Sequence, residues 1–204
     1  MAETRIYRQR ERARKHQETR QRIVDALIEL HETVGAAQTT VVEVARRAGV
    51  GRMTVYNHFA TEAEMVVACT SHWIALHPPP DVEAWRRIAD PDARLAAALE
   101  ELYAYYRETQ AMWTTAYRDA PLVESLGEVM DGTWFALLDR AVDVLAAGHG
   151  VRGSRRRRAV GALRLVVDFP TWSTLTRSGL SDTEAAEVAT AFVAASTGPA
   201  AATA

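Results

Sequence analysis

The stretch Thr39–Phe59, TTVVEVARRAGVGRMTVYNHF, decides the fold. Its spacing predicts two short helices, residues 41–48 and 52–59, with Gly49 between them. Glycine can take the positive φ that a tight turn between helices requires, and Ala45 is small where the two helices would cross. Three apolar side chains would fix the interhelical angle: Val44, Val50 and Val55. The stretch therefore predicts a helix-turn-helix, a motif whose second helix enters the major groove of DNA.

The second helix would expose side chains that can hydrogen-bond to DNA, and no carboxylate lies among them. The candidates for contact with base edges are Thr54, Tyr56 and Asn57. The candidates for contact with phosphates are Thr40, Arg52, Tyr56 and His58. Val55 and Phe59 should instead lie in the core.

These residues closely resemble the signature of TetR-type transcriptional regulators. The resemblance rests on Glu43-Val44-Ala45, Ala48-Gly49-Val50, Thr54–Phe59 and the capped run Thr61–Met65, and it covers about residues 17–68. Two positions depart from the family pattern. Gly51 stands where such proteins usually place a serine, and Met53 stands where a small residue is common.

The resemblance implies an all-α fold, with a helix-turn-helix DNA-binding domain followed by a helical ligand-binding and dimerisation domain. It also implies three partners: a double-stranded DNA operator, a small-molecule effector and a second copy of the chain. The expected organisation is a basic arm (1–16), a DNA-binding domain (17–62), a ligand-binding and dimerisation domain (63–197) and a flexible tail (198–204).

Charge is distributed unevenly along the 204 residues, although the net charge is only -2. Residues 1–60 hold eleven Lys and Arg against seven Asp and Glu, and the remainder is acidic. Such asymmetry favours a basic module fused to an acidic one. With 48% hydrophobic residues the chain can form a core.

The N-terminal segment is the most basic part, with eight basic and three acidic residues among residues 1–22. It could follow the phosphate backbone as an arm or a helix extension, or it could be a solvated tail. It has no apolar signal-peptide core. Together with a single cysteine, Cys69, this predicts a cytoplasmic, soluble protein.

Periodicity and capping residues predict helices throughout. Capping boxes begin at Thr40, Thr61 and Ser181. Besides the two motif helices, the expected helices span residues 16–33, 62–76, 91–118 with an optional break near Thr109–Ala111, 121–147, 155–177 and 182–196.

The last two helices are predicted to form a two-fold interface with a second chain, or else to be buried within one chain. The residues of this stripe are Leu163, Val166, Val167, Thr174, Val188, Ala191, Phe192 and Ala195.

Aromatic residues in the acidic part are either ordinary core or the lining of an apolar ligand cavity. The candidate ligand-binding residues are His72, Tyr106, Trp113, Tyr117, Trp134, Asp168 and Trp172. Asp168 could orient a ligand, or it could pair with Arg164 one turn earlier. Pro170 should kink the helix and free a carbonyl there.

The sequence favours neither a cofactor, a metal nor an enzyme. Gly148–Gly153 has the spacing G-x-G-x-x-G but follows an expected helix instead of a strand, and no cluster has metal-ligand spacing. The predicted function is a ligand-responsive, DNA-binding transcriptional regulator, a repressor that a small apolar or aromatic effector releases. The alternatives are a helical small-molecule-binding protein without DNA recognition and a small helical enzyme.

Overall fold

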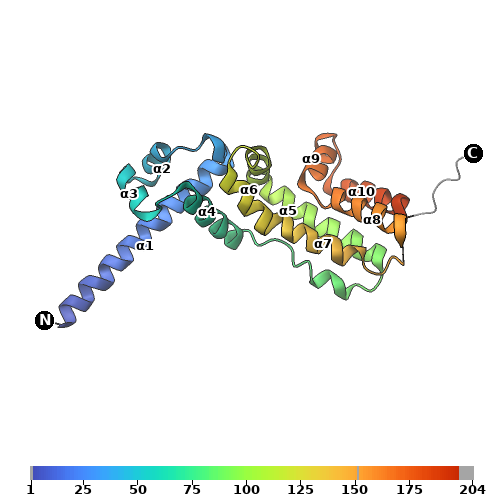
Figure 1. The fold of residues 1–204 in the computed structure, drawn as a ribbon, viewed down its shortest axis with the longest axis horizontal. Coiled ribbons are helices and arrows are strands. Elements are labelled where there is room, and N and C mark those ends of the chain that lie inside the picture. Colours follow the sequence, from blue (N-terminus) through green and yellow to red (C-terminus); the bar gives the residue numbers. More distant parts are fainter. Residues whose placement is uncertain (1, 151, 198–204) are drawn as a thin grey trace, which may run out of the picture. The chain divides into compact units, whose positions relative to one another are not determined.

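The computed structural model describes residues 2–150 and 152–197, and every regular element among them is helical (Figure 1). The predicted all-α fold is confirmed. The expected tail, residues 198–204, lies outside the described residues. Contacts divide the chain into two compact units. The first comprises the chain up to Pro78 with Ala111–Met130, and the second comprises Pro79–Gln110 and the chain from Asp131 onward.

The first unit is built from the N-terminal helices and from a segment that follows much later in the chain. Its elements are α1 (Ala2–Thr33), the 3-10 turn η1 (Ala36–Gln38), α2 (Val41–Ala48), α3 (Arg52–His58), α4 (Glu62–Leu76), the end of α5 (Pro91–Asp119) and α6 (Glu124–Met130). Helix α1 packs against both α2 and α4.

One hydrophobic cluster holds α1 to α4 together. The apolar stripe Ile23, Leu27 and Leu30 of α1 is almost completely buried against residues from the other three helices. These partners include Val44, Val55, Phe59, Met65 and Cys69. Burying each such side chain contributes about 1.5–3 kcal/mol relative to exposure, so this cluster fixes the positions of the short helices. Val55 and Phe59 are core residues, as predicted.

The turn after α1 contacts the end of α5. Gly35 has φ 90°, and a Cβ there would lie 2.2 Å from Oδ2 of Asp119 and 2.1 Å from Nη2 of Arg118. Oδ2 of the buried Asp119 accepts a hydrogen bond from the backbone N–H of Ala37 at 3.1 Å, and Arg118 donates to the Val34 carbonyl at 2.7 Å. The Arg118 guanidinium outweighs the effect of burial and, with the Ala37 amide, lowers the pKa of Asp119. Only glycine fits this approach.

The second unit contains the first part of α5 and the later helices. Its other elements are the 3-10 turn η2 (Ala84–Arg87), the π-helical turn η3 (Asp131–Phe135), α7 (Ala136–Ala146), α8 (Gly153–Val166), α9 (Phe169–Arg177) and α10 (Asp182–Thr197). Helix α8 packs against α7 and α10. The completely buried side chains of this unit include Leu99, Tyr103, Leu145, Leu163 and Trp172.

The expected helix 155–177 is two helices, α8 and α9, and the kink predicted at Pro170 is a complete break. Proline cannot donate the hydrogen bond that the Val166 carbonyl would receive in a continuous helix. Two buried tyrosines of α5 replace the missing donors: Tyr103 donates to Val166 O at 2.9 Å, and Tyr106 donates to Val167 O at 2.6 Å. The break therefore leaves these carbonyls satisfied.

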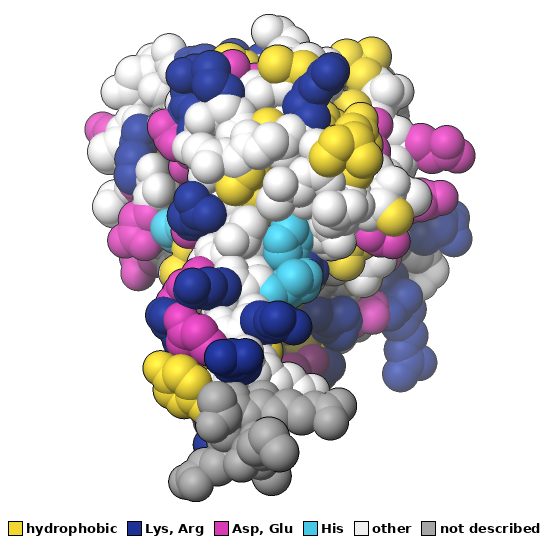
Figure 2. Space-filling view, turned by 90° about the vertical axis from the view of Figure 1, so that its left-hand side faces the viewer, with side chains coloured by type: hydrophobic (Ala, Val, Ile, Leu, Met, Phe, Trp, Pro, Cys, Tyr) yellow, Lys and Arg dark blue, Asp and Glu magenta, His cyan; other side chains and the backbone are white. Residues whose placement is uncertain are grey.

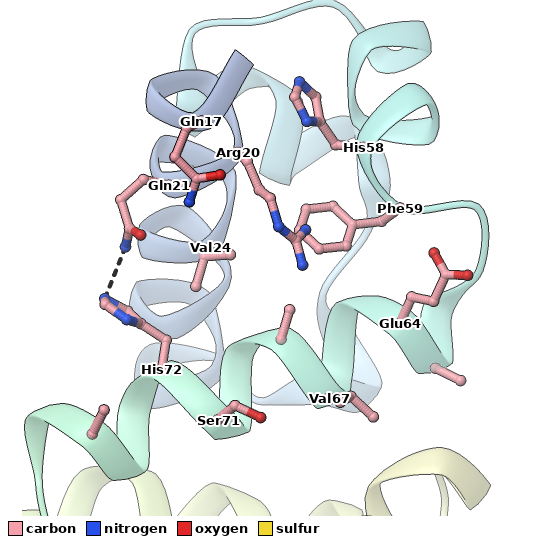
Figure 3. A pocket seen from close by; sticks show the side chains of 13 residues that line it. Gln17, Arg20, Gln21, Val24, His58, Phe59, Glu64, Val67, Ser71 and His72 are labelled. Carbon is pink, nitrogen blue, oxygen red and sulfur yellow. Dashed lines mark hydrogen bonds between the residues drawn. The ribbon is translucent and has the colours of Figure 1, made fainter. Parts of the chain in front are cut away.

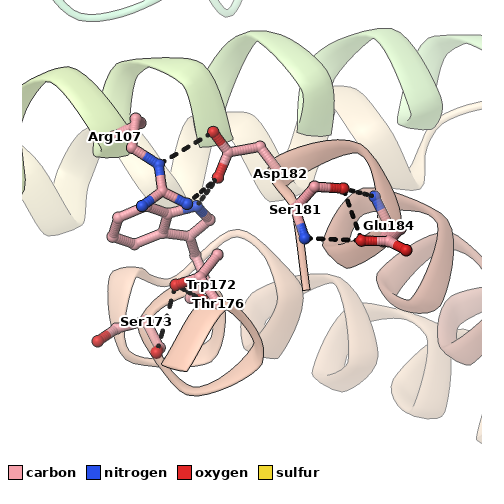
Figure 4. Close-up of polar contacts among 7 residues, drawn as sticks. All are labelled: Arg107, Trp172, Ser173, Thr176, Ser181, Asp182 and Glu184. Carbon is pink, nitrogen blue, oxygen red and sulfur yellow. Dashed lines mark hydrogen bonds and ion pairs between the residues drawn. The ribbon is translucent and has the colours of Figure 1, made fainter. Parts of the chain in front are cut away.

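Two arginines stabilise the second unit through polar contacts. Arg107 lies over the ring of Trp172 at 5.0 Å and binds Asp182 through Nη2 at 2.8 Å, while Trp172 Nε1 donates to the same carboxylate at 2.9 Å (Figure 4). Burial raises the pKa of Asp182, but hydrogen bonds from Arg107 and Trp172 outweigh it and the pKa is lowered. Arg94 is buried and donates to four backbone carbonyls, including Ala147 O at 2.7 Å just past the end of α7.

Several predicted boundaries need correction. The first helix begins at Ala2, well before residue 16. Helix α5 continues through Thr109–Ala111 without a break. The expected helix 121–147 begins at Glu124 and contains the π-helical turn η3. The predicted bounds of α2 and α4 are confirmed, as are the three capping residues, whose oxygens accept the expected N–H groups at 3.2 Å.

Within residues 2–150 and 152–197, no helix is both long enough and apolar enough to cross a membrane.

Candidate functional site

Helices α2 and α3 form the helix-turn-helix, and Gly49 makes the turn between them. Its φ of 66° and ψ of 40° are left-handed, as the sequence predicted. The Val50 N–H donates to the Ala45 carbonyl at 2.9 Å, and Nη1 of Arg22 in α1 donates to the Ala48 carbonyl at 3.1 Å. Since the last carbonyls of a helix lack partners within it, these bonds define where α2 ends.

The structure exposes the predicted polar face of α3. Arg52 and Asn57 are exposed, Tyr56 is 47% exposed, and Thr54 and His58 are half-buried. Thr40 is exposed at the N-terminus of α2, where its hydroxyl accepts the N–H of Glu43. Gly51, the N-cap residue of α3, supplies no side-chain hydrogen bond, and Met53 beside it is 70% exposed.

Two contacts that join α1 to the end of α3 were not predicted from the sequence. The rings of His16 and His58 lie 4.1 Å apart, and the guanidinium of Arg20 lies 4.1 Å from the centre of the Phe59 ring. Burial, followed by the charges of His16 and Arg20, lowers the pKa of His58. No local pattern reveals such contacts, because the partners are about forty residues apart in sequence.

A groove of about 720 Å³ lies between α1 and α4 beside these contacts (Figure 3). Its lining includes the apolar Val24, Phe59 and Val67 and the polar Arg20 and His58. His72, a predicted ligand-binding residue, lines the same groove, and its Nε2 lies 2.8 Å from Nε2 of Gln21.

The seven predicted ligand-binding residues fall into both units. His72, Trp113 and Tyr117 belong to the first unit, where Trp113 contacts Trp73 at 5.5 Å and Tyr117 at 6.1 Å. Tyr106, Trp134, Asp168 and Trp172 belong to the second unit.

In the second unit the predicted aromatic residues do come together. The Tyr106 ring lies 5.8 Å from both Trp134 and Trp172 and 5.3 Å from Phe169. Trp134 lies on the π-helical turn, a distortion that often occurs at functional sites. Asp168 is half-buried at the start of α9, and Arg164, the partner considered for it, forms an ion pair with Asp139 of α7.

The predicted interface stripe divides between core and surface. Leu163, Val166 and Val167 are buried within their own chain, so for them the alternative of burial in one chain holds. On α10, Val188 and Phe192 are each 47% exposed, and Leu165 of α8 is 51% exposed.

A buried polar pair links α1 and α4. Sγ of Cys69 lies 3.3 Å from Nδ1 of His31. Burial raises the pKa of the Cys69 thiol to about 12, and the nearby charge of Glu32 acts in the same direction. Burial lowers the pKa of His31 to about 4, although the charge of Asp119 opposes this. Both groups are therefore neutral at neutral pH, and the thiol can donate to the imidazole.

The helix-turn-helix region is similar in sequence to known regulators. Residues 23–69 match the family model described as bacterial regulatory proteins, tetR family. Over 76 residues the chain is 40% identical to the HTH-type transcriptional regulator SrpR of Pseudomonas putida. This match covers 36% of the present chain and 36% of SrpR, so the chain spans about a third of that relative's length.

The fold is similar to that of solved regulators over most of the chain. A TetR-like transcriptional regulator from Rhodococcus sp. RHA1 has a TM-score of 0.57 and 19% identity, covering 86% of this chain and 93% of that one. The transcriptional regulator FadR from Bacillus subtilis has a TM-score of 0.55 and 16% identity, covering 87% of this chain and 97% of that one. At these identities the likeness concerns the fold. Residues 23–69 are thus similar in sequence to the tetR family of bacterial regulatory proteins, and the helical architecture is similar in fold to solved regulators.

Proposed function

We propose that the protein is a cytoplasmic, homodimeric transcriptional regulator that binds a DNA operator, and that a small apolar or aromatic effector releases it. Repression is the proposed sign of regulation. The observation that carries the proposal is α3 itself. Its polar side chains point outward from a buried cluster that holds the helix rigidly, and no carboxylate lies among them.

Roles on DNA follow from the chemistry of the exposed side chains. Thr54, Tyr56 and Asn57 are proposed to contact base edges, since hydroxyl and amide groups can both donate and accept there. Thr40, Arg52 and His58 are proposed to contact phosphates, together with the Tyr56 hydroxyl. Because its pKa is lowered, His58 would contribute an N–H donor more than a charge at neutral pH.

Dimerisation is proposed to use α8 and α10. These helices pack side by side, and their apolar residues Leu165, Val188 and Phe192 are exposed in the single chain. Burying such residues against a second copy would be favourable. A dimer would also present two α3 helices to successive major grooves.

The effector is proposed to bind at the aromatic residues of the second unit, around Tyr106, Trp134 and Trp172. Aromatic side chains with few polar groups suit an apolar ligand, and Asp168 could orient it. One protein of this fold, FadR of B. subtilis, is in complex with stearoyl-CoA. For the present chain the ligand class is proposed from its own residues.

Selection of DNA from a random duplex pool by the purified full-length protein tests the proposal. We expect a two-fold symmetric motif whose half-sites are centred about 10 base pairs apart, or a multiple of that distance. Titration of the protein with apolar and aromatic compounds, followed by tryptophan fluorescence, should then identify compounds that weaken this binding.

Selection that enriches no motif would contradict the proposal and favour the alternative, a helical binding protein without DNA recognition. The alternative rests on Gly51 and the exposed Met53, the two departures from the family pattern at the start of α3.

A further inference from the structure

The N-terminal half of α1 extends beyond the hydrophobic cluster. The first residue of α1 in that cluster is Ile23, yet the helix begins at Ala2 (Figure 1). The side chains of residues 6–10 and 12–18 are exposed, including Ile6 at 51% and Tyr7 at 69%. About six turns of helix therefore precede the core, and the side chains of residues 6–18 bury no apolar face.

Charge on this segment is only partly neutralised. Glu11 pairs with Arg14 at 2.7 Å and with Lys15 at 3.8 Å, and Glu18 also pairs with Arg14. Such pairs at a spacing of three or four stabilise an exposed helix. Among the ion pairs of the described side chains, none involves Arg8, Arg10 or Arg12, so these three charges are available to a partner.

The side of α1 that meets the recognition helix is fixed by two contacts. His16 lies against His58, and Arg20 lies over Phe59, so positions 16 and 20 of α1 adjoin the end of α3. Residues four apart lie on neighbouring positions of one helix side, so Arg12 and Arg8 continue this row. The space-filling view from the side of α1, α2 and α3 shows Lys and Arg side chains gathered there, with histidines between them (Figure 2).

We propose that the N-terminal half of α1 is a second DNA-binding element, which holds backbone phosphates outside the half-site through Arg8 and Arg12. The inference rests on the proposed DNA binding and extends it. Arg8 precedes Arg20 by twelve residues, or about 18 Å of helix. At about 3.4 Å per base pair this reaches about five base pairs of flanking duplex.

A polyanion fits this surface better than a membrane does. Helices that lie in a membrane interface need an apolar face opposite the basic one, and the large apolar side chains among residues 6–18 are Ile6 and Tyr7. DNA bound at α3 would already lie at the end of the same row of basic side chains. Phosphate contacts need only charge and reach, which the helix supplies.

The test measures binding as a function of salt for the full-length wild type and for the double variant Arg8→Gln, Arg12→Gln. The probe is the duplex selected from the random pool, prepared once with ten flanking base pairs on each side and once without them. We expect the slope of log K against log salt to become shallower by about 2 per protomer in the variant on the long duplex. The preference for the selected motif should stay within about twofold, because phosphate contacts carry no sequence information.

The matched control removes the same charge elsewhere: Arg155→Gln, Arg156→Gln on α8 of the second unit. This variant should keep the wild-type slope. On the short duplex, the difference between wild type and the α1 variant should largely disappear.

The outcomes separate the two proposals. A wild type that binds the motif selectively and an α1 variant with an unchanged slope would overturn the second DNA-binding element alone. An equal loss in the α8 control would also overturn it, since net charge would then explain the effect. A wild type that binds no DNA selectively would instead refute the proposed function. Circular dichroism and thermal unfolding of both variants ensure that any change is not a loss of folding.

Discussion

Gly35 and Gly49 both have positive φ, but their surroundings differ, which makes them a useful pair. At Gly49 the nearest group to an added Cβ is the flexible end of Arg22, at 3.7 Å. At Gly35 it would meet both Arg118 and the buried Asp119 at about 2 Å. An alanine would be strained by the positive φ at both positions, but it would also clash with neighbouring side chains only at position 35.

We predict that Gly49→Ala lowers the free energy of unfolding by about 1–2 kcal/mol, through strain alone. Gly35→Ala should cost at least about 2 kcal/mol more, because Asp119 must move away from the Ala37 amide. Urea unfolding of both variants gives the comparison. Equal losses at the two positions would show that the close approach at Gly35 has no energetic weight.

His31 should make stability depend on pH. Its pKa is about 4 in the folded protein and 6.5 when unperturbed, so between these values the unfolded chain binds a proton that the folded chain does not. The folded state therefore loses stability as pH falls from 6.5 to 4, by up to about 3 kcal/mol.

The variant His31→Gln keeps an acceptor for Cys69 but cannot be protonated in this range. Its free energy of unfolding should change less steeply with pH than that of the wild type between pH 6.5 and 4. Parallel curves for the two proteins would contradict the assignment of a neutral, buried His31.

For single residues, the sequence predicted the structure where it depends on neighbours close in the chain. The turn at Gly49, the three capping residues and the core positions Val55 and Phe59 all depend on neighbours within a few positions. The contacts of Gly35 with Asp119 and of His16 with His58 join residues far apart in sequence. No spacing rule predicts them.

Among the elements, α8 and α9 meet at a break that two tyrosines stabilise. Tyr103→Phe removes only the hydroxyl that binds the Val166 carbonyl, and Tyr103 is completely buried. An unsatisfied buried carbonyl costs about 1–3 kcal/mol. We predict a loss of stability in this range by thermal or urea unfolding, with operator binding nearly unchanged under conditions where the protein is folded.

Tyr56→Phe is the matched control, since Tyr56 is half-exposed on α3. It should leave stability within about 0.5 kcal/mol and weaken operator binding. If Tyr56→Phe destabilised the protein and Tyr103→Phe did not, the division between a DNA-binding and a structural tyrosine would be wrong.

Element boundaries were predictable where capping residues mark them, as for α2 and α4. They were missed where tertiary contacts replace the lost hydrogen bonds. The tyrosines of α5 allow α8 to end at Val166, and the ion pairs of Glu11 and Glu18 support α1 where no apolar stripe predicts a helix. The π-helical turn at Asp131–Phe135 has no signature in the local pattern.

For the whole molecule, the helical fold and the likeness of the N-terminal part to tetR-family regulators could be predicted, whereas the site residues of both parts stay predictions. Charge divides the chain into a basic N-terminal part and an acidic remainder, and only the former carries a recognisable motif. The candidate ligand-binding residues were chosen as aromatic side chains, and such residues pack into both units. Their role in binding, like the domain boundaries, stays a prediction.

The proposed dimer gives a prediction at this scale. Phe192→Glu places a charge on the exposed apolar side of α10, where it is harmless in a monomer and unfavourable in a buried interface. We expect sedimentation equilibrium to show at least a tenfold weaker dimer, with helical content unchanged. Glu187→Gln, an exposed change on the same helix, serves as the control. A variant as dimeric as the wild type would place the interface elsewhere.

The central claim is that the exposed side chains of α3 distinguish one DNA sequence from another. Asn57→Ala tests it most directly, because an amide can form paired hydrogen bonds with adenine worth about 1–3 kcal/mol of discrimination. The measurement is the ratio of affinities for the selected motif and for a scrambled duplex, at a fixed salt concentration, with Thr183→Ala on α10 as control. We predict that the ratio falls by about tenfold or more in Asn57→Ala while the salt slope stays the same. An unchanged ratio in Asn57→Ala and also in Thr54→Ala would contradict the claim that α3 reads the operator.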